Sequence, residues 1–197
     1  MNVIESKIEI ACQQVLNEDS SVFSVQWVHI PVRHKGTLTP DFVLNRYFLF
    51  LRRFTLGMVI PKWTENGLEF RFLRTGLNLL AFSAPVRVDK DGLRSLTFRI
   101  CGGRFVQRNR CDRGTFSFLT EKTGNKIRVT VLLDNYHPRL LGSASPGRLR
   151  KYLYHYTQAH VHKLVTTNFL AFLFRELEGK GPRFTVVAAA VRSGEDI

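Results

Sequence analysis

The feature that most constrains the fold of this chain is a long helical pattern over residues 146–178. Ser145 is a favourable N-cap residue, Pro146 suits the first helical position, and Gly179 is a common residue just beyond a helix end. At 1.5 Å per residue, such a helix is a rod of roughly 50 Å. Its segment 168–174 is apolar on most sides, so the rest of the domain or another chain must cover it.

A second pattern, with a period of two, occupies residues 56–134. Its separators contain glycine or asparagine, which supply the positive φ that tight turns need, and such short connections join antiparallel neighbours. In 126–134, apolar side chains alternate with polar ones, so one sheet face is buried and the other is in water. The predicted strands are 56–63, 68–74, 77–88, 93–101, 104–110, 114–121 and 126–134.

Two more elements are predicted before this region. Residues 22–32 are β-branched and aromatic, which predicts a strand. Thr39 as N-cap, Pro40 at the first position and Asp41 in the first turn predict a helix over 40–54. That helix is apolar nearly all round, so we expect it to be buried on several sides.

The ends of the chain are predicted from weaker patterns. Apolar residues at helical spacing in 3–17 predict a short amphipathic N-terminal helix. The tail 180–197 contains an apolar run that could form an extra strand. We therefore expect a single α+β domain over 1–197. Its core, 22–178, is a curved antiparallel sheet of six to eight strands wrapped on a long C-terminal helix.

This order of elements resembles the helix-grip fold of the START and Bet v 1-like proteins. The strand 22–32, the helix 40–54, the strands within 56–134 and the helix 146–178 carry the resemblance. It implies a cavity between the curved sheet and the long helix, where members often bind lipids, polyketides or other apolar molecules. A fold by itself does not establish a function.

Candidate cavity residues come from the long helix and the strands. At 100° per residue, one stripe of the helix faces the sheet. The stripe consists of Leu149, Tyr152, Leu153, Tyr156, His160, Leu164, Thr167, Ala171 and Phe174. Its polar members Tyr152, Tyr156 and His160, with Trp63 and Phe98 from the strands, are the predicted ligand contacts. His160 has a second interpretation, as a hydrogen-bonded histidine of the core.

The charge favours an anionic partner. Lysine and arginine number 29 against 16 acidic residues, a formal net charge of +13. Arg104, Arg108, Arg110 and Arg113 lie on one predicted hairpin and are candidate phosphate or anion contacts. The alternative is a solvated basic hairpin, or a basic composition without any anionic partner. The chain lacks a P-loop and known nucleic-acid-binding motifs, so binding independent of sequence is the most that this pattern supports.

Catalytic and metal-binding motifs do not emerge from the sequence. We see no paired carboxylates, GxSxG or HExxH, so no catalytic residue is assigned and an enzyme is not favoured. His155 and His162 are too far apart along a helix to share one ion, so we expect no metal and no cofactor. Three cysteines without a CxxC, and no apolar stretch near ~20 residues, favour a cytoplasmic protein.

Three hypotheses follow. The first is non-catalytic binding of an apolar small molecule or lipid, with arginines holding any acidic head, in a closed cavity of roughly several hundred Å³. The second is binding of nucleic acid or an anionic membrane surface through a basic sheet face that includes Arg71, Arg99 and Arg128. The third is an interaction module, such as a homo-oligomer formed through 168–174 or the helix 40–54.

Overall fold

The structure is a computed structural model that describes the chain except for residues 1–7, 35, 37, 108–113, 143–146 and 180–182. The strands are β1 (Ile8–Leu16), β2 (Val22–Pro31), β3 (Val59–Thr64), β4 (Gly67–Phe72), β5 (Asn78–Phe82), β6 (Val86–Lys90), β7 (Leu93–Gly102), β8 (Thr115–Thr123), β9 (Lys126–Tyr136), β10 (Phe184–Ala188) and β11 (Glu195–Asp196). The helices are α1 (Pro40–Phe54), α2 (Arg148–Tyr154) and α3 (His160–Glu178), with a 3₁₀ turn at Val32–His34 and a π-helical turn at His155–Ala159.

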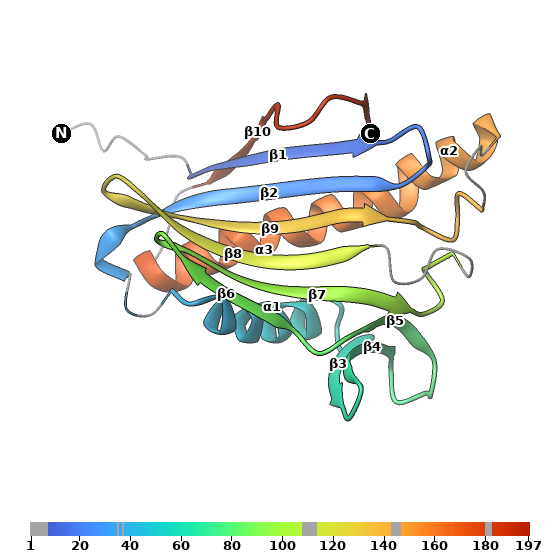
Figure 1. The fold of residues 1–197 in the computed structure, drawn as a ribbon, viewed down its shortest axis with the longest axis horizontal. Coiled ribbons are helices and arrows are strands. Elements are labelled where there is room, and N and C mark those ends of the chain that lie inside the picture. The colour runs from blue at the N-terminus through green and yellow to red at the C-terminus, as the bar shows by residue number, and fades with distance from the viewer. Residues whose placement is uncertain (1–7, 35, 37, 108–113, 143–146, 180–182) are drawn as a thin grey trace.

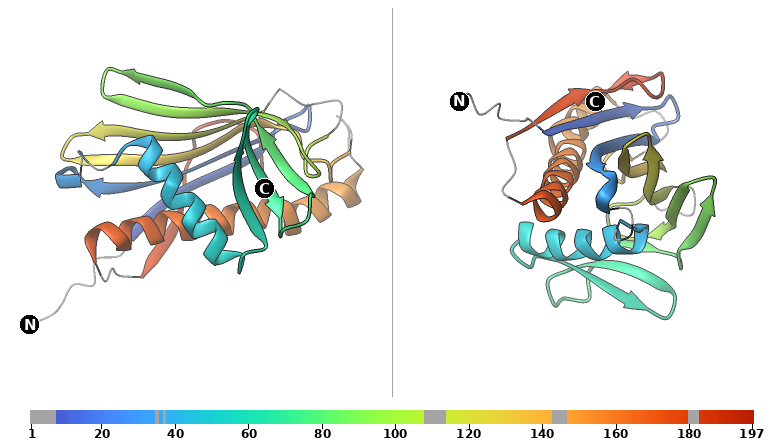
Figure 2. Two further views of the ribbon diagram at one scale, coloured as in Figure 1. Left: turned by 90° about the horizontal axis from the view of Figure 1, so that it is seen from below. Right: turned by 90° about the vertical axis from the view of Figure 1, so that its left-hand side faces the viewer.

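The strands form one curved sheet in the order β10-β1-β2-β9-β8-β7-β5-β4-β3, with β11 beside β1 and β6 beside β7. Only the pairing of β1 with β10 is parallel in the described sheet. The sheet wraps around α3, and α1 packs beside α3 on the same concave side (Figure 1, Figure 2). The predicted α+β helix-grip layout is confirmed.

The strand count is higher than the predicted six to eight, for two reasons. The predicted strand 77–88 is two strands, because the chain turns at 83–85 and β5 pairs with β4 while β6 pairs with β7. The ends of the chain add β1, β10 and β11 to one edge of the sheet. This covers an edge that would otherwise expose unpaired N–H and C=O groups.

The predicted N-terminal helix over 3–17 is wrong where the structure describes it, because residues 8–16 form strand β1. Ile8 and Ile10 point into the main core, whereas Val15 packs with Phe23 and Val25 in a second cluster on the outer face. A strand buried on both faces lacks the alternation of apolar and polar residues by which a strand is recognised.

The predicted strand 104–110 is also wrong over its described residues. Strand β7 ends at Gly102, and the chain then turns so that the amide of Phe105 donates to the carbonyl of Leu79 at 3.1 Å. Gly103 has a φ of +115° in this turn. A Cβ atom at Gly103 would lie 2.3 Å from the carbonyl oxygen of Leu79, so only glycine lets the two backbones approach so closely.

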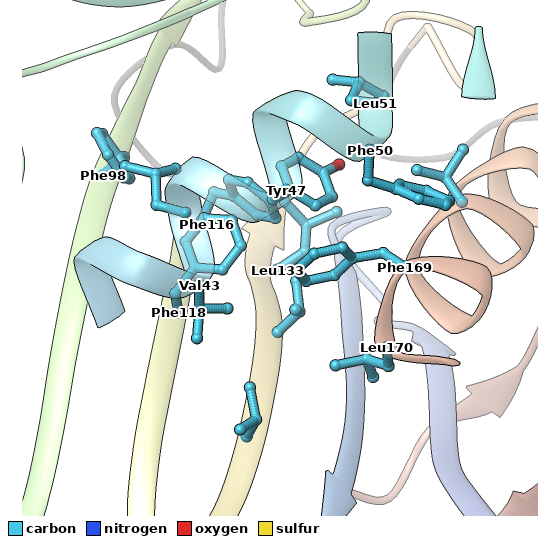
Figure 3. Packing of buried hydrophobic residues seen from close by; sticks show 14 of the residues in the cluster. Val43, Tyr47, Phe50, Leu51, Phe98, Phe116, Phe118, Leu133, Phe169 and Leu170 are labelled. Carbon is cyan, nitrogen blue, oxygen red and sulfur yellow. The ribbon is translucent and has the colours of Figure 1, made fainter. Parts of the chain in front are cut away.

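Helix α1 begins and ends as predicted. The hydroxyl of Thr39 accepts a hydrogen bond of 3.1 Å from the amide of Phe42, and Pro40 is the first helical residue. Tyr47 lies at the centre of an aromatic core, where its ring centroid is 5.0 Å from that of Phe169 and 5.3 Å from that of Phe118 (Figure 3).

The two apolar segments considered as oligomer contacts are covered within the chain. Val43, Leu44 and Tyr47 of α1 are buried, and Phe169 and Leu170 are fully buried in α3. The structure therefore does not support a homo-oligomer through 168–174 or through helix 40–54.

Candidate ligand-binding cavity

An apolar cavity lies between α1, the sheet and the long helical rod, at the end of the molecule that carries α2. Its volume is about 190 Å³. The lining residues are Tyr47, Leu51, Thr55 and Val59 from α1 and the segment after it; Phe70, Leu79, Leu80, Phe82, Ile100, Phe116, Leu133 and Tyr136 from the sheet; Phe105 from the turn after β7; and Tyr154, Gln158, Val161, His162 and Val165 from the rod. The cavity is smaller than expected, and it is not closed, since Phe105 and Val161 are 43% and 56% exposed.

The residues that the sequence assigned to the cavity lie elsewhere, as far as the structure describes their side chains. Phe98 is fully buried in the core beside Phe82, and Trp63 is half exposed and packs against Phe48 and Phe98. Tyr152 is 60% exposed, and His160 is also exposed. The side chain of Tyr156 lies outside the described residues, so four of the five predicted contacts can be placed, and none lines the cavity.

The π-helical turn explains why the first half of the predicted stripe faces away from the sheet, whereas Thr167 and Ala171 in its second half are buried. The rod was expected to be unbroken over 146–178; it ends as predicted at Glu178, but a π-helical turn at His155–Ala159 separates α2 from α3. In an α-helix, residues four apart drift around the axis by about 40° per step. A π-helical turn is wider and offsets this drift, so Tyr154, Gln158 and His162 all face the cavity.

The π-helical turn is attached to the sheet by polar side chains of β1 and β2. The side-chain amide of Gln14 donates to the carbonyl of Ala159 at 3.3 Å and to the hydroxyl of Ser24 at 3.2 Å. The amide of Gln26 donates to the same hydroxyl at 2.7 Å. Because all three side chains are buried, these contacts fix which side of the rod faces the sheet.

A short hydrogen-bonded chain crosses one wall of the cavity. The amide of Gln158 donates to the hydroxyl of Tyr136 at 3.0 Å, and that hydroxyl donates to the carbonyl of Phe105 at 2.7 Å. Burial raises the pKa of Tyr136 well above its usual value, with a smaller contribution from Tyr154. Burial likewise raises the pKa values of Tyr47 and Tyr154, so all three phenols keep their protons.

His162 is a further polar residue of the cavity wall. Burial lowers its pKa to about 4, so its imidazole is neutral near pH 7. Its Nε2 atom is buried and has no hydrogen-bond partner in the described part of the chain. Leaving a buried polar atom without a partner costs about 1–3 kcal/mol, and a ligand that supplied the partner would recover part of this cost.

The predicted anion contacts are only partly described. Arg104 is exposed beside the lining residue Phe105, and Arg108, Arg110 and Arg113 lie outside the described residues. On the basic sheet face, Arg71 pairs with Glu69 at 2.6 Å.

A second arginine of that face, Arg128, pairs with Glu121, whereas Arg99 is exposed. With two of its three arginines neutralised, this face offers little free positive charge to a phosphate backbone. The structure therefore does not support binding of nucleic acid through it.

Within the described ranges, no group of three or more His, Cys, Asp or Glu side chains is arranged to hold a metal ion. In the same residues, no helix has the length and apolar character needed to cross a bilayer. Tyr136, Tyr154, Gln158 and His162 were all missed as site residues. The spacing of four residues from Tyr154 to Gln158 to His162 was the available signal, but the predicted stripe through Tyr152 and His160 was chosen over it.

No protein-family model matches the sequence, and no curated protein matches it significantly. The solution NMR structure of CalU16 from Micromonospora echinospora is similar, with 11% identity, 89% of this chain and 78% of that chain covered, and a TM-score of 0.38. The crystal structure of human STARD10 is 9% identical over 86% of this chain and 76% of that chain, with a TM-score of 0.36. The crystal structure of CalU16 is 12% identical over 65% of this chain and 68% of that chain, with a TM-score of 0.30. The helix-grip layout is assigned from the sheet and helices described above.

Proposed function

We propose that this chain binds an apolar small molecule, or the apolar end of a lipid, in the cavity and does not transform it. The observation that carries the proposal is a space of about 190 Å³ whose wall is mostly aliphatic and aromatic. An apolar cavity of about 150 Å³ can hold a molecule the size of benzene. The enclosed part of the ligand is therefore about one ring or a short alkyl chain, and a longer ligand would extend past Phe105 and Val161.

The polar groups on the wall favour a ligand with a hydroxyl or carbonyl group. The hydroxyl of Tyr136 and the neutral imidazole of His162 offer hydrogen bonds inside a mostly apolar space. Their pKa values are shifted away from neutrality in opposite directions, so neither group exchanges a proton readily at pH 7. This supports binding and orientation of the ligand over acid–base catalysis. Arg104 is exposed and precedes Phe105 in the chain, and we propose it as the contact for an acidic group that projects from the cavity.

Native mass spectrometry of protein purified without detergent tests the proposal. We expect a copurified molecule, or uptake of an added neutral fluorophore such as N-phenyl-1-naphthylamine. Val161→Trp should reduce either signal at least tenfold, because the larger ring occupies the cavity wall. Val191→Trp is the matched control, since Val191 is exposed to the same degree (57% against 56%) and does not line the cavity. No copurified ligand together with no probe uptake would refute the proposal.

A further inference from the structure

Five segments surround the open side of the cavity, and none contains an aspartate or glutamate. They are 51–59, 73–80, 103–107, 138–142 and 147–161, and together we term them the mouth surface. Four of them contribute lining residues to the cavity. The fifth is held against the turn after β7, where the amide of Arg139 donates to the carbonyl of Phe105 at 2.7 Å.

The mouth surface carries a concentration of free positive charge. Its arginines are exposed, and among the described residues none of them lies within 4.0 Å of a carboxylate oxygen. They are Arg52, Arg53, Arg74, Arg104, Arg139, Arg148 and Arg150.

Most of the ion pairs that arginines form lie outside the mouth surface. Arg46 pairs with Glu176 at 3.0 Å near the end of α3, and Arg94 pairs with Asp89 at 3.0 Å on the β6–β7 hairpin. The C-terminal end of α3 and the turn of the β6–β7 hairpin lie toward the opposite end of the molecule from α2 (Figure 1). Exposed arginines without an ion pair among the described residues also occur elsewhere, as at Arg175 and Arg183, but the mouth surface combines several of them with no acidic residue of its own.

The same surface exposes large apolar side chains. Leu56 is 89% exposed and Leu149 is 71% exposed. Leu56 and Leu73 both have a φ of +51°, a left-handed conformation that is costly for leucine. Their turns are joined, since the amide of Leu73 donates to the carbonyl of Met58 at 2.7 Å. Leucines on exposed turns beside arginines make a surface with both apolar and cationic contacts.

We propose that the mouth surface docks on an anionic phospholipid bilayer. The arginines contact headgroup phosphates, and the exposed leucines enter the boundary between headgroups and acyl chains. The aliphatic character of the exposed side chains favours a bilayer over a nucleic acid, which offers stacking and phosphate contacts but little apolar surface. Docking in this orientation places the cavity opening against the lipid. The inference goes beyond ligand binding and does not depend on the cavity being occupied.

Co-sedimentation with phosphatidylcholine vesicles, with and without about 30 mol% phosphatidylserine, tests this surface at physiological ionic strength. The unmodified chain should bind the anionic vesicles and leave the neutral ones largely unbound. Each arginine near an anionic surface changes partitioning by about fivefold. The triple variant Arg53→Glu, Arg74→Glu, Arg148→Glu should therefore lose at least tenfold in vesicle binding.

The matched control is Lys90→Glu, Lys122→Glu, Lys126→Glu, which makes the same change of net charge at exposed positions on the distant β-turns. It should bind vesicles within about threefold of the unmodified chain, as expected for charges beyond the Debye length from the docked surface. A second variant, Leu56→Asn with Leu149→Gln, keeps all charges and should weaken binding at high salt, where insertion dominates.

Several outcomes would overturn the proposal. One is equal loss in the two charge-reversed variants, which would show that net charge alone drives binding. Another is absence of binding to anionic vesicles at low salt. A third is tighter binding of single-stranded RNA than of vesicles, lost in the mouth-surface variant, which would assign these arginines to nucleic acid. Circular dichroism of each variant checks that it is folded.

Discussion

The side-chain amide of Gln158 donates a hydrogen bond of 3.0 Å to the hydroxyl of Tyr136, and this contact joins the π-helical turn to the end of β9. The same hydroxyl donates to the carbonyl of Phe105 at the open side of the cavity. Three parts of the chain that are distant in sequence therefore meet at one phenolic oxygen. The shape of the cavity wall depends on this junction.

Tyr136→Phe should lower the free energy of unfolding by about 1 kcal/mol, because the ring remains while two partly buried hydrogen-bonding groups lose their partner. Gln158→Leu removes the hydrogen bond between residues 158 and 136 while keeping the hydroxyl of Tyr136. Since the two variants share a contact, the double variant should be less destabilised than the sum of the singles, by on the order of 1 kcal/mol. Urea unfolding of the four proteins measures this coupling, and strict additivity would show that the contact contributes nothing.

The stability of the chain should depend on pH through His162. Histidine in an unfolded chain has a pKa of about 6.5, whereas burial lowers that of folded His162 to about 4. Between these values only the unfolded chain takes up the proton. The free energy of unfolding therefore decreases as the pH falls from about 6.5 toward 4, and above 6.5 this group has no effect.

Between pH 7 and pH 5 the decrease due to His162 should be about 2 kcal/mol. His162→Gln should remove most of this dependence in urea unfolding at the two pH values. His29→Gln is the control: desolvation, Lys126 and Arg128 also lower the pKa of His29, but this side chain is partly exposed and should contribute less. An unchanged pH dependence in His162→Gln would contradict the assignment of this histidine to the cavity wall.

Two adjacent glycines should respond very differently to alanine. Gly103→Ala places a Cβ atom 2.3 Å from the carbonyl oxygen of Leu79 at a φ of +115°, and we expect a loss of about 2–3 kcal/mol of stability. Gly102→Ala meets no atom within 4 Å and should change stability by less than about 1 kcal/mol. Thermal unfolding compares the pair, and similar melting temperatures for both variants would contradict the described turn.

Elements whose ends are set by local chemistry were predictable from the sequence. Helix α1 begins at Pro40 because Thr39 caps the amide of Phe42, and both the cap and the proline are visible in the sequence. Strand β9 alternates because one of its faces is buried in the main core and the other is only partly buried. Such patterns report the environment of a segment directly.

Elements whose environment comes from distant parts of the chain were not predictable in the same way. The sequence of strand β1 has the apolar pattern of a helix because the C-terminal tail covers the outer face of the strand. There the side chain of Gln13 accepts hydrogen bonds from the amides of Val191 and Arg192. The inward side of the long rod depends on the π-helical turn and on the contact of Gln14 with Ala159. A uniform period of 100° per residue therefore predicted that Tyr152 and His160 line the cavity. In the structure His162 lines it instead.

The most direct test of ligand binding follows backbone amide signals in ¹⁵N-labelled protein while a small neutral aromatic alcohol such as 2-phenylethanol is added. The proposed function predicts saturable shifts confined to residues around the cavity: Thr55–Val59, Leu79–Phe82 and Tyr154–Val165. Val161→Trp should abolish these shifts and Val191→Trp should retain them. Shifts scattered over the surface, or equal in both variants, would contradict an internal binding site.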